Sequence, residues 1–176
     1  QIAAAHPGDL GVVASLLLRH AVLRPGEAVF MPAGGLHAYL RGTGIELLAN
    51  SDNVVRAGLT GKHVDSAELL RLLDPAALVP AIEPRPAGDG LLVYDSPAPE
   101  FRLYRAEAGP EETALPAAGQ PRIVLCTDGA AVLRGGRGAL KVVRGESCFL
   151  SAADGAVSAS GPASLFIATD GIGPRA

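Results

Sequence analysis

The chain has 176 residues, a hydrophobic fraction of 48% and a formal net charge of −3. This length suits one medium domain or two small ones, and the apolar content is sufficient for a folded core. The lack of a basic excess argues against a nucleic-acid surface, which needs clustered lysine and arginine. The apolar run Val12–Leu18 is far too short to span a bilayer, so no membrane segment is expected.

Two short helices are expected in the first half. Asp9 follows a Pro-Gly turn and is a candidate N-cap for an apolar helix over Leu10–Leu18. A second helix is expected over Asp65–Leu73, because Asp65 with Glu68 three residues later resembles a capping box and a proline follows the helix end.

The rest of the chain reads as short strands between Gly and Pro turns. The segment Pro84–Gly90, PRPAGDG, is the best candidate for a linker. Many short strands with glycine-rich turns are typical of antiparallel barrels and sandwiches. The expected strands are Ala21–Leu23, Ala28–Met31, His37–Leu40, Ile45–Asn50, Asn53–Ala57, Leu91–Tyr94, Phe101–Tyr104, Arg122–Cys126, Ala131–Leu133, Leu140–Val143, Ser147–Leu150 and Ser164–Ala168.

The segment Gly26–His37, GEAVFMPAGGLH, reads Gly, five residues, Pro, one residue, Gly, two residues, His. This spacing resembles the second sequence motif of cupins, small β-barrels that hold a metal ion inside. The motif turns the chain and begins the next strand with an imidazole aimed at the barrel's centre. His37 is therefore a candidate metal ligand, but a catalytic zinc site needs about three protein ligands, and the motif supplies one.

A weak internal echo of this motif occurs in the second half. Aligning Gly26 with Gly145 places GEAVFMPAGGLH over GESCFLSAADGA, so that Gly, Glu and Phe coincide. At the ligand position, His37 becomes Ala156. The echo favours a second cupin-like unit without a metal ligand, although a match this short also arises by chance.

Alternation along the strands groups several polar side chains. His37 and Tyr39 share one face, and if His37 points into a barrel, Glu46 and Arg56 on the following strands point into the same cavity. Charges inside a barrel are costly unless they are paired or used. Glu46 is therefore either a functional carboxylate or the buried ion-pair partner of Arg56, and Tyr39 is interpreted as barrel packing.

The block His37–Lys62, HAYLRGTGIELLANSDNVVRAGLTGK, closely resembles type I mannose-6-phosphate isomerases, whose signature contains His-Ala-Tyr, a Glu on the next strand, Ser-Asp-Asn, Val-Arg-Ala-Gly and Leu-Thr-Pro-Lys. The resemblance is very specific over Pro7–Asp74 and weaker but collinear to the C-terminus. It implies a mainly β fold of cupin, or jelly-roll, antiparallel barrels with short helices. Residues 1–78 would form the C-terminal part of the catalytic cupin, and residues 79–176 a C-terminal cupin-like domain lacking metal ligands.

The resemblance also implies an activity, the interconversion of mannose 6-phosphate and fructose 6-phosphate through a zinc-assisted enediol, on the route to GDP-mannose. His37 corresponds to a ligand of the single zinc ion. Arg56 would be catalytic and substrate-binding, stabilising the enediolate or the phosphate, and Lys62 would bind the phosphate. Glu46 would transfer a proton or orient a neighbour.

The chain departs from the family pattern in two places. The family's Gln-x-His pair is missing, since Gln1 and Gln120 are the only glutamines, and Gly61 replaces the proline before Lys62. The remaining zinc ligands are therefore expected outside this chain, which would be a C-terminal piece with weak zinc binding and little activity. The alternatives are a non-catalytic sugar-binding or regulatory cupin and, third, an iron-dependent cupin dioxygenase, which would leave Arg56 and Lys62 without a role.

The remaining features give expectations about location and partners. No secretion signal precedes the first strands, so a cytoplasmic protein is expected, with Cys126 and Cys148 as buried free thiols. The expected partner is a sugar phosphate, without nucleic acid or membrane, and the full-length protein is expected to be a monomer. Three further histidines, His6, His20 and His63, have no motif around them and are interpreted as surface or structural residues. Asp52 and Asn53 are expected to shape a turn between strands.

Overall fold

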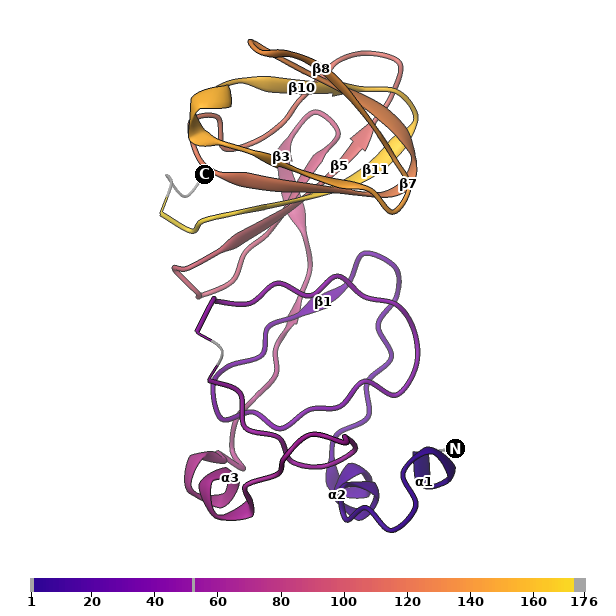
Figure 1. The fold of residues 1–176 in the computed structure, drawn as a ribbon, viewed down its shortest axis with the longest axis vertical. Coiled ribbons are helices and arrows are strands. Elements are labelled where there is room, and N and C mark those ends of the chain that lie inside the picture. Colours follow the sequence, from indigo (N-terminus) through magenta and orange to yellow (C-terminus); the bar gives the residue numbers. More distant parts are fainter. Residues whose placement is uncertain (1, 52, 173–176) are drawn as a thin grey trace. The chain divides into compact units, whose positions relative to one another are not determined.

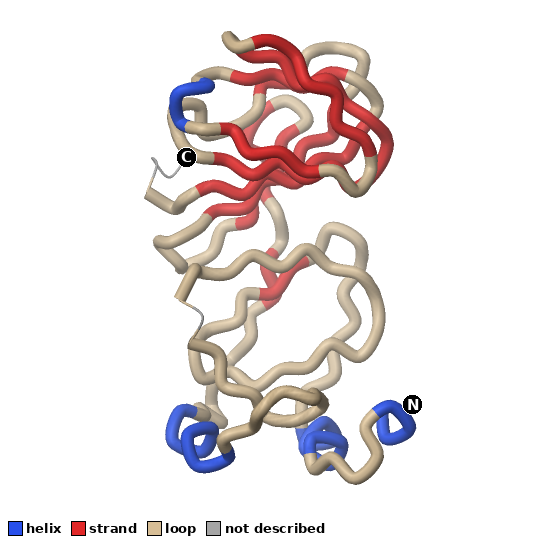
Figure 2. Tube along the Cα trace, in the orientation of Figure 1, coloured by secondary structure: helices blue, strands red, loops and turns tan. Residues whose placement is uncertain are grey.

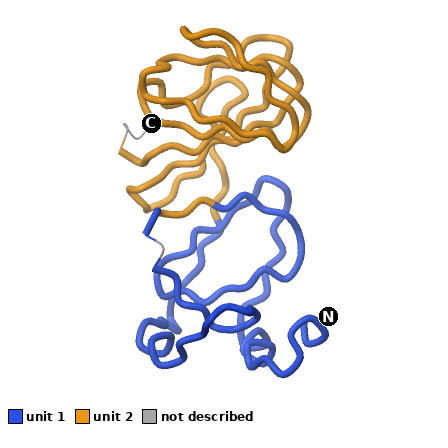
Figure 3. The backbone as a smooth tube through the Cα atoms, viewed as in Figure 1, with its two compact units in different colours: residues 1–46, 50–81 blue, residues 47–49, 82–176 orange. Residues whose placement is uncertain are grey.

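A computed structural model describes residues 2–51 and 53–172, and the chain divides into two compact units (Figure 3). Unit 1 comprises residues 1–46 and 50–81, and unit 2 comprises residues 47–49 and 82–176. Most of the regular β structure lies in unit 2 (Figure 2). Within the described residues, no helix has the length and apolar character needed to cross a membrane.

Unit 2 is a curled antiparallel sheet built around two long central strands, β7 and β11 (Figure 1). The strand order is β3-β4-β5-β11-β7-β10-β6, with β8 and β9 also pairing with β7. The elements of this unit are β3 (Arg85–Gly88), β4 (Leu91–Tyr94), β5 (Arg102–Ala108), β6 (Thr113–Ala114), β7 (Arg122–Gly135), β8 (Gly138–Val143), β9 (Ser147–Leu150), the 3-10 turn η1 (Ala152–Asp154), β10 (Val157–Ser160) and β11 (Ala163–Thr169).

Strand β7 changes partners halfway along, and a glycine makes this possible. Its first part pairs with β9 and β11, and its second part with β8 and β10. At the junction Gly129 has φ 68°, and a Cβ there would lie 1.9 Å from the Pro162 carbonyl oxygen. Only glycine fits such a close approach in a left-handed conformation. The two strands expected over 122–126 and 131–133 are therefore one bent strand.

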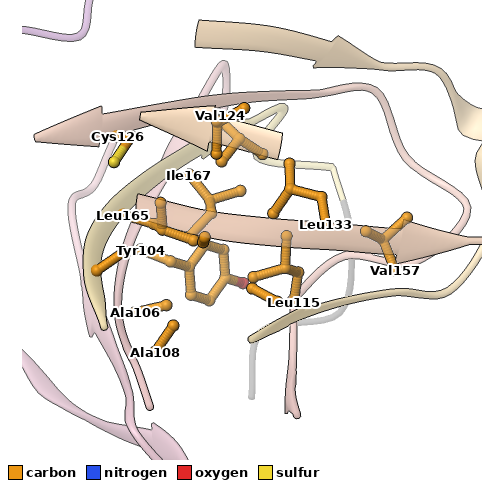
Figure 4. Packing of buried hydrophobic residues seen from close by; sticks show 14 of the residues in the cluster. Tyr104, Ala106, Ala108, Leu115, Val124, Cys126, Leu133, Val157, Leu165 and Ile167 are labelled. Carbon is orange, nitrogen blue, oxygen red and sulfur yellow. The ribbon is translucent and has the colours of Figure 1, made fainter. Parts of the chain in front are cut away.

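The hydrophobic core lies entirely within unit 2 (Figure 4). Alternate residues of β11 are buried, and Leu165 and Ile167 have no exposed surface. Cys126 is fully buried and Cys148 is partly buried; both thiols are free, and burial raises the pKa of each. The mainly β prediction is confirmed, with alternation of buried and outward side chains as its physical basis.

Unit 1 holds the helices and little regular β structure. Its helices are α1 (Ile2–Ala5), α2 (Gly11–Leu17) and α3 (Ser66–Leu72), and its strand is β1 (Ala28–Val29). A short strand β2 (Ala81–Ile82) follows at the boundary with unit 2. The predicted helices over 10–18 and 65–73 are thus confirmed, and the Asp65 side chain caps α3 by accepting from the Glu68 N–H at 3.0 Å.

Most strands expected in unit 1 are absent from the part of the chain that is described. Of the five, only the one over Ala28–Met31 forms in part, whereas the others run as extended or irregular segments without ladder pairing. The physical reason is that β-propensity requires a neighbouring strand and a buried face, and all the buried hydrophobic residues lie between Leu91 and Ile167.

Two further expectations in unit 2 were wrong. The candidate linker Pro84–Gly90 contains strand β3, whose Arg85 stands opposite Val93 of β4. The short strands β6 and β10 were missed because Thr113–Ala114 and Val157–Ser160 carry few large apolar side chains. β6 pairs with β10, and β10 pairs on its other side with β7, which a local pattern does not reveal.

Candidate functional site

Three of the residues singled out from the sequence lie together in unit 1. The rings of His37 and Tyr39 meet edge to face, with their centroids 5.7 Å apart. The Tyr39 hydroxyl donates a hydrogen bond to Glu46 Oε1 at 3.1 Å. The fold therefore joins an imidazole, a phenol and a carboxylate in one line of contacts.

Tyr39 is not packed inside a barrel, so the interpretation of this residue as barrel packing is wrong. Its side chain is 77% exposed, because the segment around it belongs to no sheet. Partial desolvation, followed by the negative charge and hydrogen bond of Glu46, raises the pKa of Tyr39. The phenol thus stays protonated and serves Glu46 as a hydrogen-bond donor over a wide pH range.

Glu46 and Arg56 do not form the buried ion pair that the sequence left open. Both residues are exposed, and no ion pair joins them among the described residues. The strands that were to bring them face to face lack the ladder pairing that would set their register. That alternative is therefore wrong, and Glu46 has Tyr39 as its hydrogen-bond partner.

Lys62 lies on a loop that is anchored at a distance by Asp9. The Lys62 N–H donates to Thr60 Oγ1 at 3.2 Å, and its side chain is exposed. The Asp9 carboxylate accepts from the N–H of Gly11 and from the N–H of Leu59, each at 2.7 Å. The sequence indicated Asp9 as a helix cap and gave no sign of its contact fifty residues away.

The described residues do not make a complete metal site. No group of three or more His, Cys, Asp or Glu side chains suited to a metal ion occurs among them. His37 and Glu46 are linked only through Tyr39, and His6, His20 and His63 join no such group. One imidazole does not fit the usual zinc requirement of three or four protein ligands. Asp52, one of the two residues expected to shape a turn, lies outside the described residues.

The internal echo has a structural counterpart in the turn that begins each motif. The Glu27 N–H donates to the Arg24 carbonyl at 3.0 Å, and the Glu146 N–H donates to the Val143 carbonyl at 2.9 Å. In each turn the same Glu also uses its Oε2 to accept from the first residue's N–H, at 2.7 Å from Arg24 and 3.0 Å from Val143. The turns around the aligned glycines Gly26 and Gly145, which are 119 positions apart, thus share a four-residue hydrogen-bond pattern.

The second turn of the motif is also repeated. The Gly35 N–H donates to the Pro32 carbonyl at 3.2 Å, and at the aligned positions the Asp154 N–H donates to the Ser151 carbonyl at 3.0 Å. The backbone turn has therefore survived the exchange of Pro for Ser. The first segment has Pro32 and Gly35 at these two positions, and the second has Ser151 and Asp154, where Asp154 Oδ2 accepts from both the N–H and the hydroxyl of Ser151.

At the position aligned with His37 the second segment has Ala156, and a buried arginine contacts the preceding residue, Gly155. Arg122 is 1% exposed and donates to the carbonyl oxygens of Gly155 at 2.6 Å and Pro116 at 3.2 Å. Burial lowers the pKa of this guanidinium, partly offset by the charge of Asp154. The sequence reasoning missed Arg122, because an arginine that opens a strand usually faces solvent.

Comparisons of sequence identify a set of relatives. No family model matches the chain. The chain is 38% identical over 171 residues to mannose-6-phosphate isomerase of Salmonella typhimurium, covering 91% of the chain and 41% of that protein. The corresponding enzyme of Escherichia coli K12 is 35% identical over 158 residues, covering 89% of the chain and 40% of that protein.

Solved structures agree with these relatives. A mutant of phosphomannose isomerase from Salmonella typhimurium matches with a TM-score of 0.83 and 34% identity, covering 96% of this chain and 44% of the mutant. The same enzyme bound to fructose 6-phosphate and zinc matches with a TM-score of 0.59 and 32% identity, covering 70% of this chain and 32% of the enzyme. By sequence and by fold the chain belongs with the mannose-6-phosphate isomerases, and it spans about two fifths of their length.

Proposed function

We propose that this chain is part of an aldose–ketose isomerase that interconverts mannose 6-phosphate and fructose 6-phosphate. The main support for this proposal is the 38% identity to a mannose-6-phosphate isomerase over 91% of the chain. The cluster of His37, Tyr39 and Glu46 supports the same proposal, because it brings an imidazole, the expected metal ligand, near a carboxylate, the expected proton-transfer group. The structural neighbour that binds fructose 6-phosphate and zinc adds further support.

The proposed roles follow from the chemistry of isomerisation. A proton leaves C2 of the aldose and is delivered to C1, while a hydroxyl proton passes from O2 to O1, so the reaction needs a base and a stabiliser of the enediolate. Glu46 would carry or orient the proton, with Tyr39 donating to its carboxylate. Arg56 would stabilise the enediolate or the phosphate, and Lys62 would bind the phosphate as a point charge.

We propose zinc as the cofactor of the whole enzyme, with His37 supplying one ligand and residues outside this chain supplying the others. Bound zinc would polarise the sugar oxygens. The described residues alone lack a three-donor group, so the chain by itself would bind zinc weakly. In the same proposal, residues 1–78 complete a catalytic cupin, residues 79–176 form a cupin-like domain, and the full-length protein works as a cytoplasmic monomer.

A second candidate is a non-catalytic sugar-binding or regulatory cupin. One observation favours it, namely the absence of a three-donor metal group among the described residues. Such a module would keep Arg56 and Lys62 for the phosphate and would not turn substrate over.

Zinc analysis and an isomerase assay on the full-length protein and on this chain separate the two candidates. The isomerase proposal expects one zinc per full-length molecule with robust turnover, and little of either for the 176-residue chain. Sugar-phosphate binding by the full-length protein without zinc or turnover would support the regulatory module instead. Stoichiometric zinc and full turnover in this chain alone would contradict the requirement for outside ligands.

A further inference from the structure

The Asp9 side chain ties the start of helix α2 to the loop carrying the proposed phosphate-binding residues. Its Oδ1 accepts from the Gly11 N–H and its Oδ2 from the Leu59 N–H, each at 2.7 Å. The two bonds use both oxygens of one carboxylate and join residues fifty positions apart. Bonds from backbone N–H groups to a carboxylate are among the stronger hydrogen bonds in proteins.

The backbone at this contact is held in an unusual conformation. Gly58 has φ 134° and Leu59 has φ 55°, which is rare for a residue with a side chain. A Cβ on Gly58 would lie 2.8 Å from Asp9 Oδ1 and 3.0 Å from the Cα of Gly11, so the two backbones touch. A left-handed leucine persists only where its surroundings determine its conformation, and here the hydrogen bond that its N–H donates to Asp9 does so.

The anchored pair lies between the two proposed phosphate-site cations. Arg56 precedes Gly58 by two residues, and Lys62 follows Leu59 by three. Neither side chain is buried, so the position of each charge depends on its backbone and not on packing. In the loop after Leu59, the Lys62 N–H donates a local hydrogen bond to Thr60 Oγ1.

We infer that Asp9 is a positioning residue of the proposed isomerase site. Its carboxylate holds the Leu59 backbone against the start of α2 and thereby fixes where Arg56 and Lys62 present their charges to the sugar phosphate. The inference rests on the proposed function for the identity of the ligand, but the contact itself does not. Small displacements of positioned groups are costly to catalysis, which gives the contact its functional weight.

The first test compares Asp9→Ala with Asp65→Ala in the full-length protein. Asp65 is a matched control, because it caps a helix of the same seven-residue length through one bond to the Glu68 N–H and is not bonded to Leu59. The measured quantities are the KM for mannose 6-phosphate and the inhibition constant of inorganic phosphate. Neither depends on the fraction of active protein, so a loss of stability alone does not change them.

Asp9→Ala is expected to raise both constants by about tenfold to a hundredfold, the scale associated with a group displaced by an ångström. Asp65→Ala is expected to change them less than twofold. Unchanged constants in Asp9→Ala, or an equal rise in Asp65→Ala, would overturn the inference. If Asp9→Ala does not fold, Asp9→Asn replaces it in the test. The amide of Asn keeps one acceptor oxygen but turns an N–H toward the other backbone donor, so a rise in both constants is expected for this variant too.

Hydrogen exchange over residues 57–62 tests the contact independently of activity. The Leu59 amide is expected to exchange at least about tenfold faster in Asp9→Ala than in the wild type, since it loses its acceptor. It is expected to be unchanged in Asp65→Ala. If the wild type does not isomerise the sugar phosphate, the proposed function fails, but the exchange result still decides whether Asp9 holds the loop. Equal exchange of the Leu59 amide in the wild type and Asp9→Ala would show that Asp9 does not hold it.

Discussion

Single hydrogen bonds hold individual residues of unit 1 in place. Glu46 is held by the Tyr39 hydroxyl, and Leu59 by the Asp9 carboxylate. Arg56 and Lys62 are exposed, so solvent screens their charges, and the roles proposed for them depend on where the chain places these side chains. At this scale, the proposed site would depend on where the backbone places its exposed charges and not on charge burial.

Replacing Arg56 by Ala in the full-length protein is expected to lower kcat/KM by about a hundredfold or more, because a cation at a developing enediolate acts mainly in the transition state. Steady-state kinetics with mannose 6-phosphate measures the effect. The matched control is Arg19→Ala, an exposed arginine of the same unit outside the motif. Turnover within a few-fold of the wild type in Arg56→Ala would remove Arg56 from the site.

We expect the contribution of Asp154 to the stability of unit 2 to be lost in acid. The hydroxyl and the N–H of Ser151 lower its pKa in the folded state. Its contribution is therefore present above the unfolded value of about 4 and is lost as the pH falls through the lower native value. Thermal unfolding of the wild type and Asp154→Asn should differ at pH 6, and the difference should shrink as the pH falls below the unfolded value. A constant difference across this range would contradict the assignment.

At the scale of the elements, β11 organises unit 2. It pairs along its length with β5 on one side and β7 on the other, and every second side chain enters the core. A central strand has both hydrogen-bonding edges and one face buried, so its side chains have little room to relax.

Leu165→Ala is expected to destabilise unit 2 by about 2–5 kcal/mol, the usual cost of a cavity in a packed core. Leu165 is 0% exposed, whereas Ile123 on the outward face of β7 is 54% exposed. Ile123→Ala is therefore the control and is expected to cost less than about 1 kcal/mol. Urea unfolding followed by circular dichroism measures both, and similar losses in the two variants would contradict the core assignment.

Over the whole molecule, the two units differ in what stabilises them. Unit 2 contains the hydrophobic core and the large sheet, whereas unit 1 contributes no member of the core cluster. Large apolar side chains of unit 1 are instead exposed, among them Leu10, Leu16, Leu17, Val22, Leu70 and Leu78. A unit that buries little apolar surface gains little free energy of folding by itself.

Limited trypsin digestion of the chain is therefore expected to cut unit 1 first and to leave a resistant fragment containing unit 2. Cleavage of native proteins follows local opening, which is easiest where few apolar contacts hold the chain. Mass spectrometry of the early products should identify cuts after the exposed arginines of unit 1: Arg19, Arg24, Arg41 and Arg56. Early cuts within β7 or β11 would contradict this division of stability.

The accuracy of prediction depended on whether the signal was local. The helix over 66–72 was predicted because Asp65 caps it within one turn, and β4 and β9 were predicted with the observed bounds because their residues are strongly β-forming. The strand over 37–40 was not formed, since pairing needs a second segment. The contact from Asp9 to Leu59 had no signal, because glycine and leucine at 58 and 59 give no hint of a distant carboxylate.

The sequence by itself determined the family, the mainly β class, the caps and turns, and the choice of His37, Glu46, Arg56 and Lys62, because each depends on residue type at short spacing. Only the tertiary structure decided that Glu46 meets Tyr39 and not Arg56, that Arg122 lies buried against the Gly155 carbonyl, and that Asp9 anchors Leu59. Those outcomes depend on which distant segments approach one another, and that is decided by the free energy of packing the whole chain.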